Sequence, residues 1–258
     1  MRALPSRRLL ARRIEVVSEC ASTSDEMRLR MANADEIPDL LLARHQSKGR
    51  GRKARDWWSG PAGVNLSFTL RMQPPDPAWC GGLLAACAIA ACSEHYSGRT
   101  AALKWPNDVL LENGDGQLAK VGGLLAELPA DFPDLLIGIG LNLNAAPPAE
   151  VAPYACTSVA AANPARANNP ISTGCFLVTL LWELEKRWRR YLHAGPDSLE
   201  HEFLERLRVW APNGVYAPDD SAMARGTLLE FSVRDGLTWG DSNPQTHPLG
   251  MLPELAKI

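Results

Sequence analysis

Two turn dipeptides near the middle of the chain, Asn113-Gly114 and Asp115-Gly116, constrain its fold more than any other feature. Both favour a tight hairpin, because asparagine, aspartate and glycine accept the left-handed backbone that such turns require. An extended apolar run, residues 109–112, precedes the two dipeptides, and residues 120–128 follow them. The sequence therefore predicts an antiparallel pairing of these two runs.

Other strands and helices are predicted from the spacing of apolar residues. Strands are expected at residues 14–17, 40–43, 65–72 and 135–144. Helices are expected at residues 27–31, 81–96, 175–191 and 199–209. In the strand of residues 135–144, glycine and asparagine alternate with Ile and Leu, so one face is small enough to leave room for a ligand.

Three segments of the chain differ in composition from the predicted strands and helices. The first fourteen residues carry five arginines, which favours a solvated helix over a secretory signal, with a transit peptide as the alternative. Residues 147–170 are rich in Pro, Ala and Asn and are expected to be irregular. After residue 210, short β-like runs such as residues 227–233 alternate with glycine turns. We therefore expect a larger domain over residues 1–210 and a small C-terminal β domain over residues 211–258.

Composition indicates a globular protein of the cytoplasm. The 258 residues are 46% apolar and carry a formal net charge of −2, which disfavours bulk binding of nucleic acid. The longest apolar stretch, residues 81–92, is too short to span a bilayer, so no membrane segment is expected. Six cysteines lack any CxxC pair, which fits a reducing compartment.

The segment from Gly49 to Trp58 combines four cations and two glycines with two tryptophans. Glycine lets the backbone approach a ligand closely, and arginine carries a permanent fork of donors for phosphate or carboxylate oxygens. An indole provides a flat apolar face for a purine. The segment joins the strands predicted at residues 40–43 and 65–72, so we expect a loop at one end of a sheet that wraps an anion.

Four polar clusters are expected at strand ends or turns: Ser22-Thr23, Gln46 with the loop, Lys104 to Asp108, and Lys120 with Asn142. Together they suit an anionic nucleotide and a second small polar ligand. Phosphoryl or nucleotidyl transfer needs cations, a metal and positioning, and it needs no nucleophilic side chain. Each cluster also has a purely structural interpretation: a helix N-cap, exposed lysines, or a turn closed by an aspartate.

In their order and spacing these segments resemble the catalytic part of the biotin protein ligases, also called biotin–[acetyl-CoA carboxylase] ligases. The resemblance covers roughly residues 14–210. It rests on Ser22-Thr23, Gln46, Gly49-Arg50-Gly51-Arg52, Arg55, Trp57, Asn65, Lys104-Trp105-Pro106-Asn107-Asp108, Lys120 to Glu127, and Gly138 to Asn142. It implies an α+β fold with a mixed, mostly antiparallel sheet flanked by helices, as in class II synthetases, and a small β-barrel-like appendage.

The resemblance also implies a reaction and a set of site residues. Biotin and ATP would form biotinyl-5′-adenylate, and the acyl group would pass to a lysine of a biotin carboxyl carrier domain. Lys120, Arg50 and Arg52 would be catalytic, and Asp108 would bind Mg²⁺. Biotin would contact Ser22, Thr23, Gln46, Gly49, Arg50, Arg52, Lys120, Gly123 and Gly138. ATP would contact Arg52, Arg55, Trp57, Lys104, Asn107, Asp108, Lys120 and Asn142.

Several positions depart from the family pattern. Ala54 replaces a third glycine of the loop, Ser24 replaces an asparagine, and Ala21 stands where an acidic residue is common. Few residues precede Ile14, so we expect no winged DNA-binding domain; a weak homodimer is compatible with the resemblance. The alternatives are a lipoate or octanoyl ligase of related architecture, and a nucleic-acid-binding module that uses the Gly/Arg loop.

Overall fold

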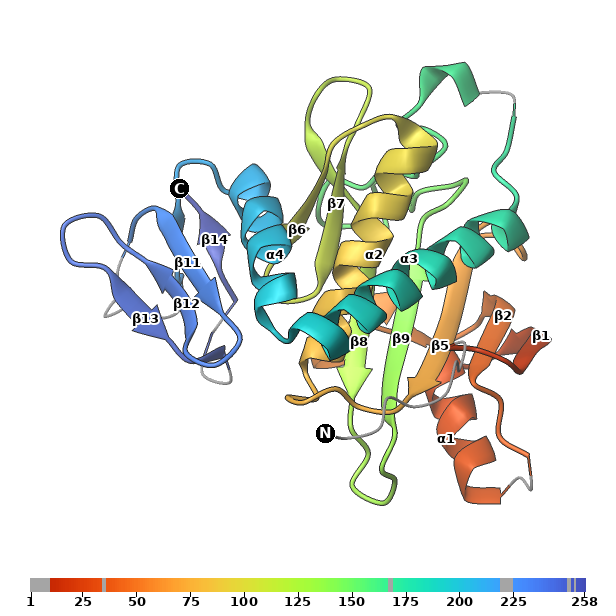
Figure 1. Cartoon of the computed structure of the whole chain (residues 1–258). Coiled ribbons are helices and arrows are strands. Elements are labelled where there is room, and N and C mark those ends of the chain that lie inside the picture. The colour runs from red at the N-terminus through yellow and green to blue at the C-terminus, as the bar shows by residue number, and fades with distance from the viewer. Residues whose placement is uncertain (1–9, 34–35, 167–168, 219–224, 250–251, 253) are drawn as a thin grey trace.

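The computed structural model describes residues 10–33, 36–166, 169–218, 225–249, 252 and 254–258, and within them a seven-stranded sheet forms the centre of the fold (Figure 1). In spatial order its strands are β1 (Ile14–Cys20), β2 (Leu40–Gln46), β5 (Leu66–Met72), β9 (Leu135–Leu141), β8 (Leu118–Glu127), β7 (Asp108–Glu112) and β6 (Ala101–Lys104). Among these neighbours only β1 and β2 are parallel. The expected mixed, mostly antiparallel sheet is confirmed.

The predicted hairpin is the turn between β7 and β8. Leu110 pairs with Lys120, and Glu112 pairs with Leu118. At the turn, the side-chain oxygen of Asn113 accepts hydrogen bonds from the backbone N–H groups of Asp115 and Gln117. Gly116 has a φ of 75°, the left-handed conformation that made glycine informative in the sequence. The Gly/Arg loop also lies where it was expected, between the antiparallel neighbours β2 and β5.

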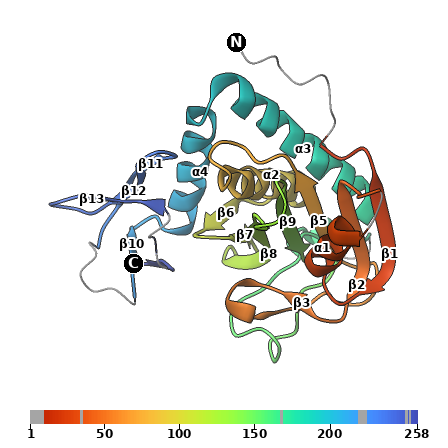
Figure 2. The same ribbon diagram turned by 90° about the horizontal axis from the view of Figure 1, so that it is seen from below.

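Helices cover both faces of the sheet, because successive residues of a strand point to opposite faces. Leu40 of β2 packs into the main core with α2 (Cys80–Ser97), α3 (Thr173–Ala194) and α4 (Asp197–Trp210). The adjacent Leu41 packs on the other face, against Met27 and Met31 of α1 (Thr23–Asn33). Figure 2 shows α2 and α3 on one side of the sheet. This arrangement brings the first turn of α1 to the face that carries the Gly/Arg loop.

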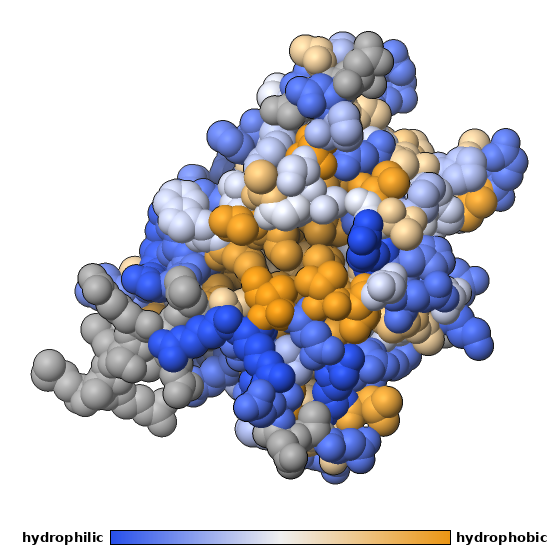
Figure 3. All heavy atoms as spheres, turned by 90° about the vertical axis from the view of Figure 1, so that its right-hand side faces the viewer, coloured by the Kyte–Doolittle hydropathy of each residue, from blue (hydrophilic) through white to orange (hydrophobic). Residues whose placement is uncertain are grey.

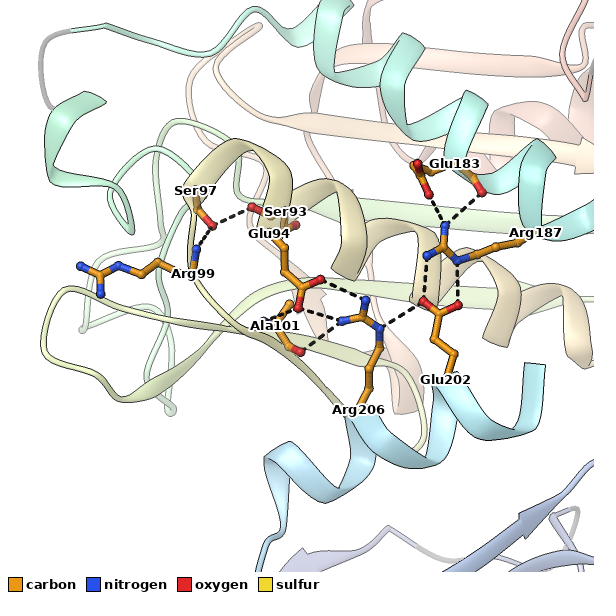
Figure 4. Close-up of polar contacts among 9 residues, drawn as sticks. All are labelled: Ser93, Glu94, Ser97, Arg99, Ala101, Glu183, Arg187, Glu202 and Arg206. Carbon is orange, nitrogen blue, oxygen red and sulfur yellow. Dashed lines mark hydrogen bonds and ion pairs between the residues drawn. The ribbon is translucent and has the colours of Figure 1, made fainter. Parts of the chain in front are cut away.

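A network of charged side chains ties α4 to the rest of the helix layer (Figure 4). Arg206 of α4 donates to both carboxylate oxygens of Glu94 on α2 and to the carbonyl of Ala101 on β6. Glu202, one turn earlier, accepts two hydrogen bonds from Arg187 of α3. Two helices and the edge strand β6 are thereby held to α4.

The C-terminal residues form two small sheets beside α4 (Figure 1). One contains β11 (Leu228–Ser232), β12 (Gly236–Trp239) and β13 (Gln245–His247); the other pairs β10 (Val215–Tyr216) with β14 (Ala256–Lys257). The expected small β appendage is confirmed, but it is not a closed barrel: closure requires an unbroken ring of paired strands, and among the described residues these two sheets stay separate. The boundary at residue 210 stays a prediction.

The expected N-terminal helix falls mostly on residues 1–9, outside the described residues. Residues 10–13 are not helical, because the backbone N–H groups of Arg12 and Arg13 donate to the carboxylate of Asp39 instead. Figure 3 shows hydrophobic side chains gathered on the side of the molecule that carries β1, where Ile14 and Val16 are exposed. None of the described helices is long and apolar enough to cross a membrane.

Candidate active site

A cavity of about 320 Å³ collects residues from all four polar clusters. Its walls come from the first turn of α1, the end of β2, the Gly/Arg loop, the β6–β7 turn and the centres of β8 and β9. Of the residues expected in the site, it is lined by Ser22, Thr23, Gln46, Arg50, Arg52, Arg55, Trp57, Lys104, Asn107, Asp108, Lys120, Gly123 and Gly138. Gly49 and Asn142 lie instead along a second cavity of about 870 Å³.

One end of the first cavity is built from the start of α1. The N–H of Thr23 is one of the donors that a helix leaves unsatisfied, and it donates to Oε1 of Gln46 at 2.7 Å. Ser22 contributes its carbonyl, which accepts from the N–H of Glu26, and no side-chain cap from Ser22 occurs among the described contacts. The N-cap alternative therefore explains neither hydroxyl, and both Ser22 and Thr23 lie buried against the cavity.

Gly138 and Gly123 both line this cavity, but the space that a Cβ atom would have differs between the two positions. A Cβ on Gly138 would lie 2.6 Å from Oγ of Ser24, which is too close for a normal contact. The lack of a side chain at Gly138 therefore allows α1 to pack closely against β9. A Cβ on Gly123 would meet Cε of Lys120 and Oδ1 of Asp108 only at ordinary van der Waals distances, 3.5 and 3.6 Å. Gly138 therefore serves helix packing, and the expectation that Gly123 makes room for a ligand stays a prediction.

Lys120 and Asp108 form an ion pair in the middle of the cavity. Nζ of Lys120 lies 2.6 Å from Oδ1 of Asp108, on the neighbouring strand. The side chains are 14% and 22% exposed, and the ammonium also lies 5.8 Å from the ring centre of Trp57 and 5.0 Å from that of Tyr154. A half-shielded cation at this place can stabilise negative charge more strongly than a solvated one.

The remaining residues of the β6–β7 turn frame this pair. Nδ2 of Asn107 donates to the carbonyl of Leu124 at 2.9 Å, so its amide holds the turn onto β8. Lys104 pairs with Asp108 in the β-ladder and lines the cavity, and no ion pair of Lys104 occurs among the described residues. Its ammonium is thus free for an anionic ligand.

The Gly/Arg loop forms a two-stranded ribbon of β3 (Gly49–Arg50) and β4 (Asp56–Trp57), with a 3-10 turn over Arg52–Ala54 between them. Arg50 is ion-paired with Asp25 of α1. Nζ of Lys53 and Nη2 of Arg55 lie 3.6 and 3.8 Å from Oε2 of Glu254.

The left-handed residue of the loop is Lys53, with a φ of 54°. The expected effect of Ala54 on closure of the loop stays a prediction.

Trp57 lines both cavities. Its indole lies over Gly140, where any Cβ would overlap the ring. Beyond it, Asn142 is buried and donates from Nδ2 to the carbonyl of Thr157 at 3.2 Å. Cys156 also lines this second cavity, and burial raises the pKa of its thiol, which disfavours a thiolate nucleophile there.

Some residues around the cavity were missed in the sequence. Asp25 and Glu254 hold the loop arginines, Tyr154 contacts Lys120, and Thr69 supports Thr23. Asp25 directly follows a recognised motif and could have been suspected. The others stand in segments without any motif, and only the fold brings them to the site.

Comparisons with known proteins identify the family of this chain. The profile of the Biotin/lipoate A/B protein ligase family matches residues 19–144. A biotin–[acetyl-CoA-carboxylase] ligase of Mycobacterium tuberculosis is 34% identical over 79% of this chain and 76% of its own length. The chain belongs to the biotin protein ligases. The bifunctional ligase/repressor BirA of Bacillus subtilis is 35% identical over 88% of the chain, which spans 63% of that longer relative.

Solved structures of this family share the fold. The biotin protein ligase of Aquifex aeolicus, in complex with biotin and ATP, superposes with a TM-score of 0.74 over 95% of this chain and 98% of its own, at 21% identity. The biotin protein ligase of Leishmania major, in complex with biotinyl-5-AMP, has a TM-score of 0.59 at 20% identity and covers 92% of this chain and 98% of its own. At 20–21% sequence identity, these superpositions show that the fold is shared and nothing more.

Proposed function

We propose that this biotin protein ligase joins biotin and ATP to biotinyl-5′-adenylate, releasing pyrophosphate, and then transfers biotin to a lysine of a biotin carboxyl carrier protein. The observation that carries the proposal is the position of the Lys120–Asp108 pair. It lies in one cavity with uncharged donors at the α1 end and a set of arginines at the loop end. Such a cavity suits a ligand that is neutral and polar at one end and anionic at the other.

The α1 end is our proposed site for the ureido ring of biotin. Ser22, Thr23 and Gln46 would hold the ring, with the backbone of Gly49, Gly123 and Gly138 close to the ring and chain. The valeryl carboxylate would then extend toward Lys120 and the loop arginines. The size of the cavity, about 320 Å³, is of the order of a small-molecule site.

We assign catalysis to Lys120, Arg50 and Arg52. As the biotin carboxylate oxygen attacks the α-phosphorus, the bond to pyrophosphate breaks and charge gathers on the phosphate oxygens. Lys120, released from Asp108 by the incoming phosphate, would neutralise that charge, and Arg50 and Arg52 would close over it. In the second step a carrier lysine amine attacks the acyl carbon, and AMP leaves.

The nucleotide would use the rest of the set. Arg52, Arg55, Lys104 and Lys120 would contact phosphates, Asn107 and Asp108 the ribose or phosphate region, and Trp57 and Asn142 the adenine end. The second cavity, with Asn142 and Trp57 on its wall, is the proposed place for the base. A cytoplasmic location and a weak homodimer stay predictions.

Mg²⁺ is part of this proposal. Among the described residues no cluster of three or more potential ligands exists, and of the three carboxylates that line the cavity, Asp56, Asp108 and Glu254, only Asp108 is ion-paired with Lys120. This fits Mg²⁺ held mainly by ATP phosphates and water with one protein carboxylate, the usual arrangement for this ion. Asp108 would hold it, and the ion would neutralise phosphate charge when bound.

The test is release of pyrophosphate from ATP, measured with biotin and with lipoate. We expect release with biotin, and Lys120→Ala should slow it by about a hundredfold, the scale of a single charge-stabilising group. Lys186→Ala, which removes an exposed lysine of α3, is the control and should leave the rate unchanged.

Three other results would change the proposal. An unchanged rate in Lys120→Ala would remove Lys120 from the mechanism. Release with lipoate and none with biotin would make the chain a lipoate ligase. RNA binding that weakens steeply with salt, without any effect of biotin on the melting temperature, would favour the nucleic-acid alternative.

A further inference from the structure

The first cavity is lined by three carboxylates, which differ in their ion pairs. Asp108 is paired with Lys120, and Glu254 is paired with two cations of the Gly/Arg loop. The third carboxylate belongs to Asp56, which is exposed. No ion pair and no side-chain hydrogen bond of Asp56 occurs among the described residues. Its carboxylate is therefore open to a ligand.

The cation opposite Asp56 in the β-ladder has another partner. Asp56 lies directly across from Arg50 in the ribbon of β3 and β4. Side chains at such opposed positions lie on the same face of a ribbon, and opposite charges there stabilise the pairing. Arg50 is nevertheless ion-paired with Asp25 of α1. The loop thus keeps one carboxylate without a counter-ion, although the same loop is rich in arginine.

Asp56 is also close to the proposed reaction centre. It lines both cavities, as do Lys120 and Trp57. In the proposed function the biotin carboxylate extends toward Lys120, so the acyl carbon of the adenylate lies in a cavity whose wall includes Asp56. Because Asp56 is exposed, a group that arrives from solvent can reach its carboxylate.

An unpaired carboxylate is a poor contact for the ligands of the first step. The biotin carboxylate and the ATP phosphates are anions, and like charges repel. Mg²⁺ arrives with the phosphates that it neutralises. The acceptor lysine of the second step is different, because a free lysine side chain has a pKa of about 10.4 and enters as a cation at neutral pH. Its ammonium matches the carboxylate of Asp56.

We propose that Asp56 binds the ammonium group of the acceptor lysine and orients it toward the acyl carbon of the adenylate. The inference rests on the proposed function and assigns Asp56 to the second step alone. In that step the nitrogen loses one proton to water, attacks the acyl carbon, and loses a second proton to water as the amide bond forms. The bond between the acyl carbon and the phosphate oxygen breaks, and AMP leaves.

The experiment compares a cationic acceptor with an uncharged one. The adenylate is formed on the enzyme from biotin, ATP and Mg²⁺, unbound substrates are removed, and AMP release is measured after addition of n-butylamine or hydroxylamine at neutral pH. Butylamine is a cation like the lysine side chain, whereas hydroxylamine is mostly uncharged. Asp56→Asn should lower the rate constant for butylamine about fivefold at low salt, the scale of one exposed charge pair, and should affect that for hydroxylamine little. The difference should shrink as ionic strength rises.

Two further variants serve as controls. Asp56→Glu keeps the charge and should retain the wild-type ratio of the two rate constants. Asp131→Asn removes an exposed carboxylate from the connection between β8 and β9, which lines neither cavity at this residue, and should change neither rate constant. If Asp56→Asn changes both rate constants equally, or leaves the butylamine rate constant unchanged, the inference is overturned.

The first step distinguishes this inference from the proposed function. A wild type that releases no pyrophosphate with biotin overturns both. A wild type that releases pyrophosphate, together with an Asp56→Asn variant that releases it more slowly, would assign Asp56 to the nucleotide or its Mg²⁺ and overturn the inference alone.

Discussion

The arginines of the helix layer and those of the Gly/Arg loop have the same side chain, but they differ in how many of their N–H donors are bound to other residues of the protein. The side chains of Arg187 and Arg206 are 11% and 13% exposed, and each binds two glutamates (Figure 4). In the loop, the side chains of Arg50 and Arg55 are 42% and 63% exposed. No ion pair of Arg52 occurs among the described residues.

This comparison separates arginines that hold the fold from arginines that can hold a ligand. Burial raises the pKa of Glu202, but the hydrogen bonds and positive charges of Arg187 and Arg206 together bring that pKa below its usual value, so the carboxylate stays charged and keeps its arginines. A guanidinium whose three nitrogens all donate to carboxylate and carbonyl oxygens of the protein is poorly placed to bind a phosphate as well. The loop arginines keep unbound donors, and their exposed ion pairs are weak enough to exchange for a ligand.

The largest expected effect is on stability in the helix layer. Arg206→Met leaves Glu94 and Glu202 without this partner, and breaking a buried pair from one side costs about 3–5 kcal/mol. Urea unfolding should show this loss, while pyrophosphate release by the folded fraction stays at the wild-type rate. Arg189→Met, on the exposed side of α3, should change the free energy of unfolding by less than about 1 kcal/mol. Equal losses in the two variants would contradict the distinction.

Arg52→Ala should produce the converse pattern. We expect biotin-dependent pyrophosphate release to fall by about a hundredfold, because an unpaired loop guanidinium is removed from the phosphates. The melting temperature should stay within about 1 °C of the wild type, since substitutions of exposed side chains change stability little. Arg189→Ala is the control for activity. A drop in melting temperature as large as that of Arg206→Met would make Arg52 a structural residue.

The smallest effect is expected at the pair that joins the loop to α1. Asp25→Asn releases Arg50, which no longer has to leave a carboxylate before it binds phosphate. An exposed pair is worth at most about 1 kcal/mol, so KM for ATP should fall by no more than about fivefold. The difference should shrink as ionic strength rises. A higher KM for ATP in Asp25→Asn would mean that the pair prepares Arg50 for the nucleotide.

The sequence predicted those elements that form through contacts between residues close to one another along the chain. The β7–β8 hairpin follows from Asn113 and Gly116, and α2 follows from its unbroken apolar composition. The features that the sequence did not predict depend on long-range partners. Asp39 takes the backbone N–H groups that a helix at residues 10–13 would need. The C-terminal strands form two separate sheets, and no local pattern states which strands pair.

By itself, the sequence determined the order of the strands along the chain, the Gly/Arg loop between two of them, and the residue types that surround the cavity. Only the tertiary structure decided which donors remain free. Arg50 and Arg206 differ through partners 25 and 112 residues away, and Thr69 donates a hydrogen bond to Thr23 from 46 residues away. Hydrogen-bond polarity and charge neutralisation depend on distances of about 3 Å, which are established when the sheet and helices pack.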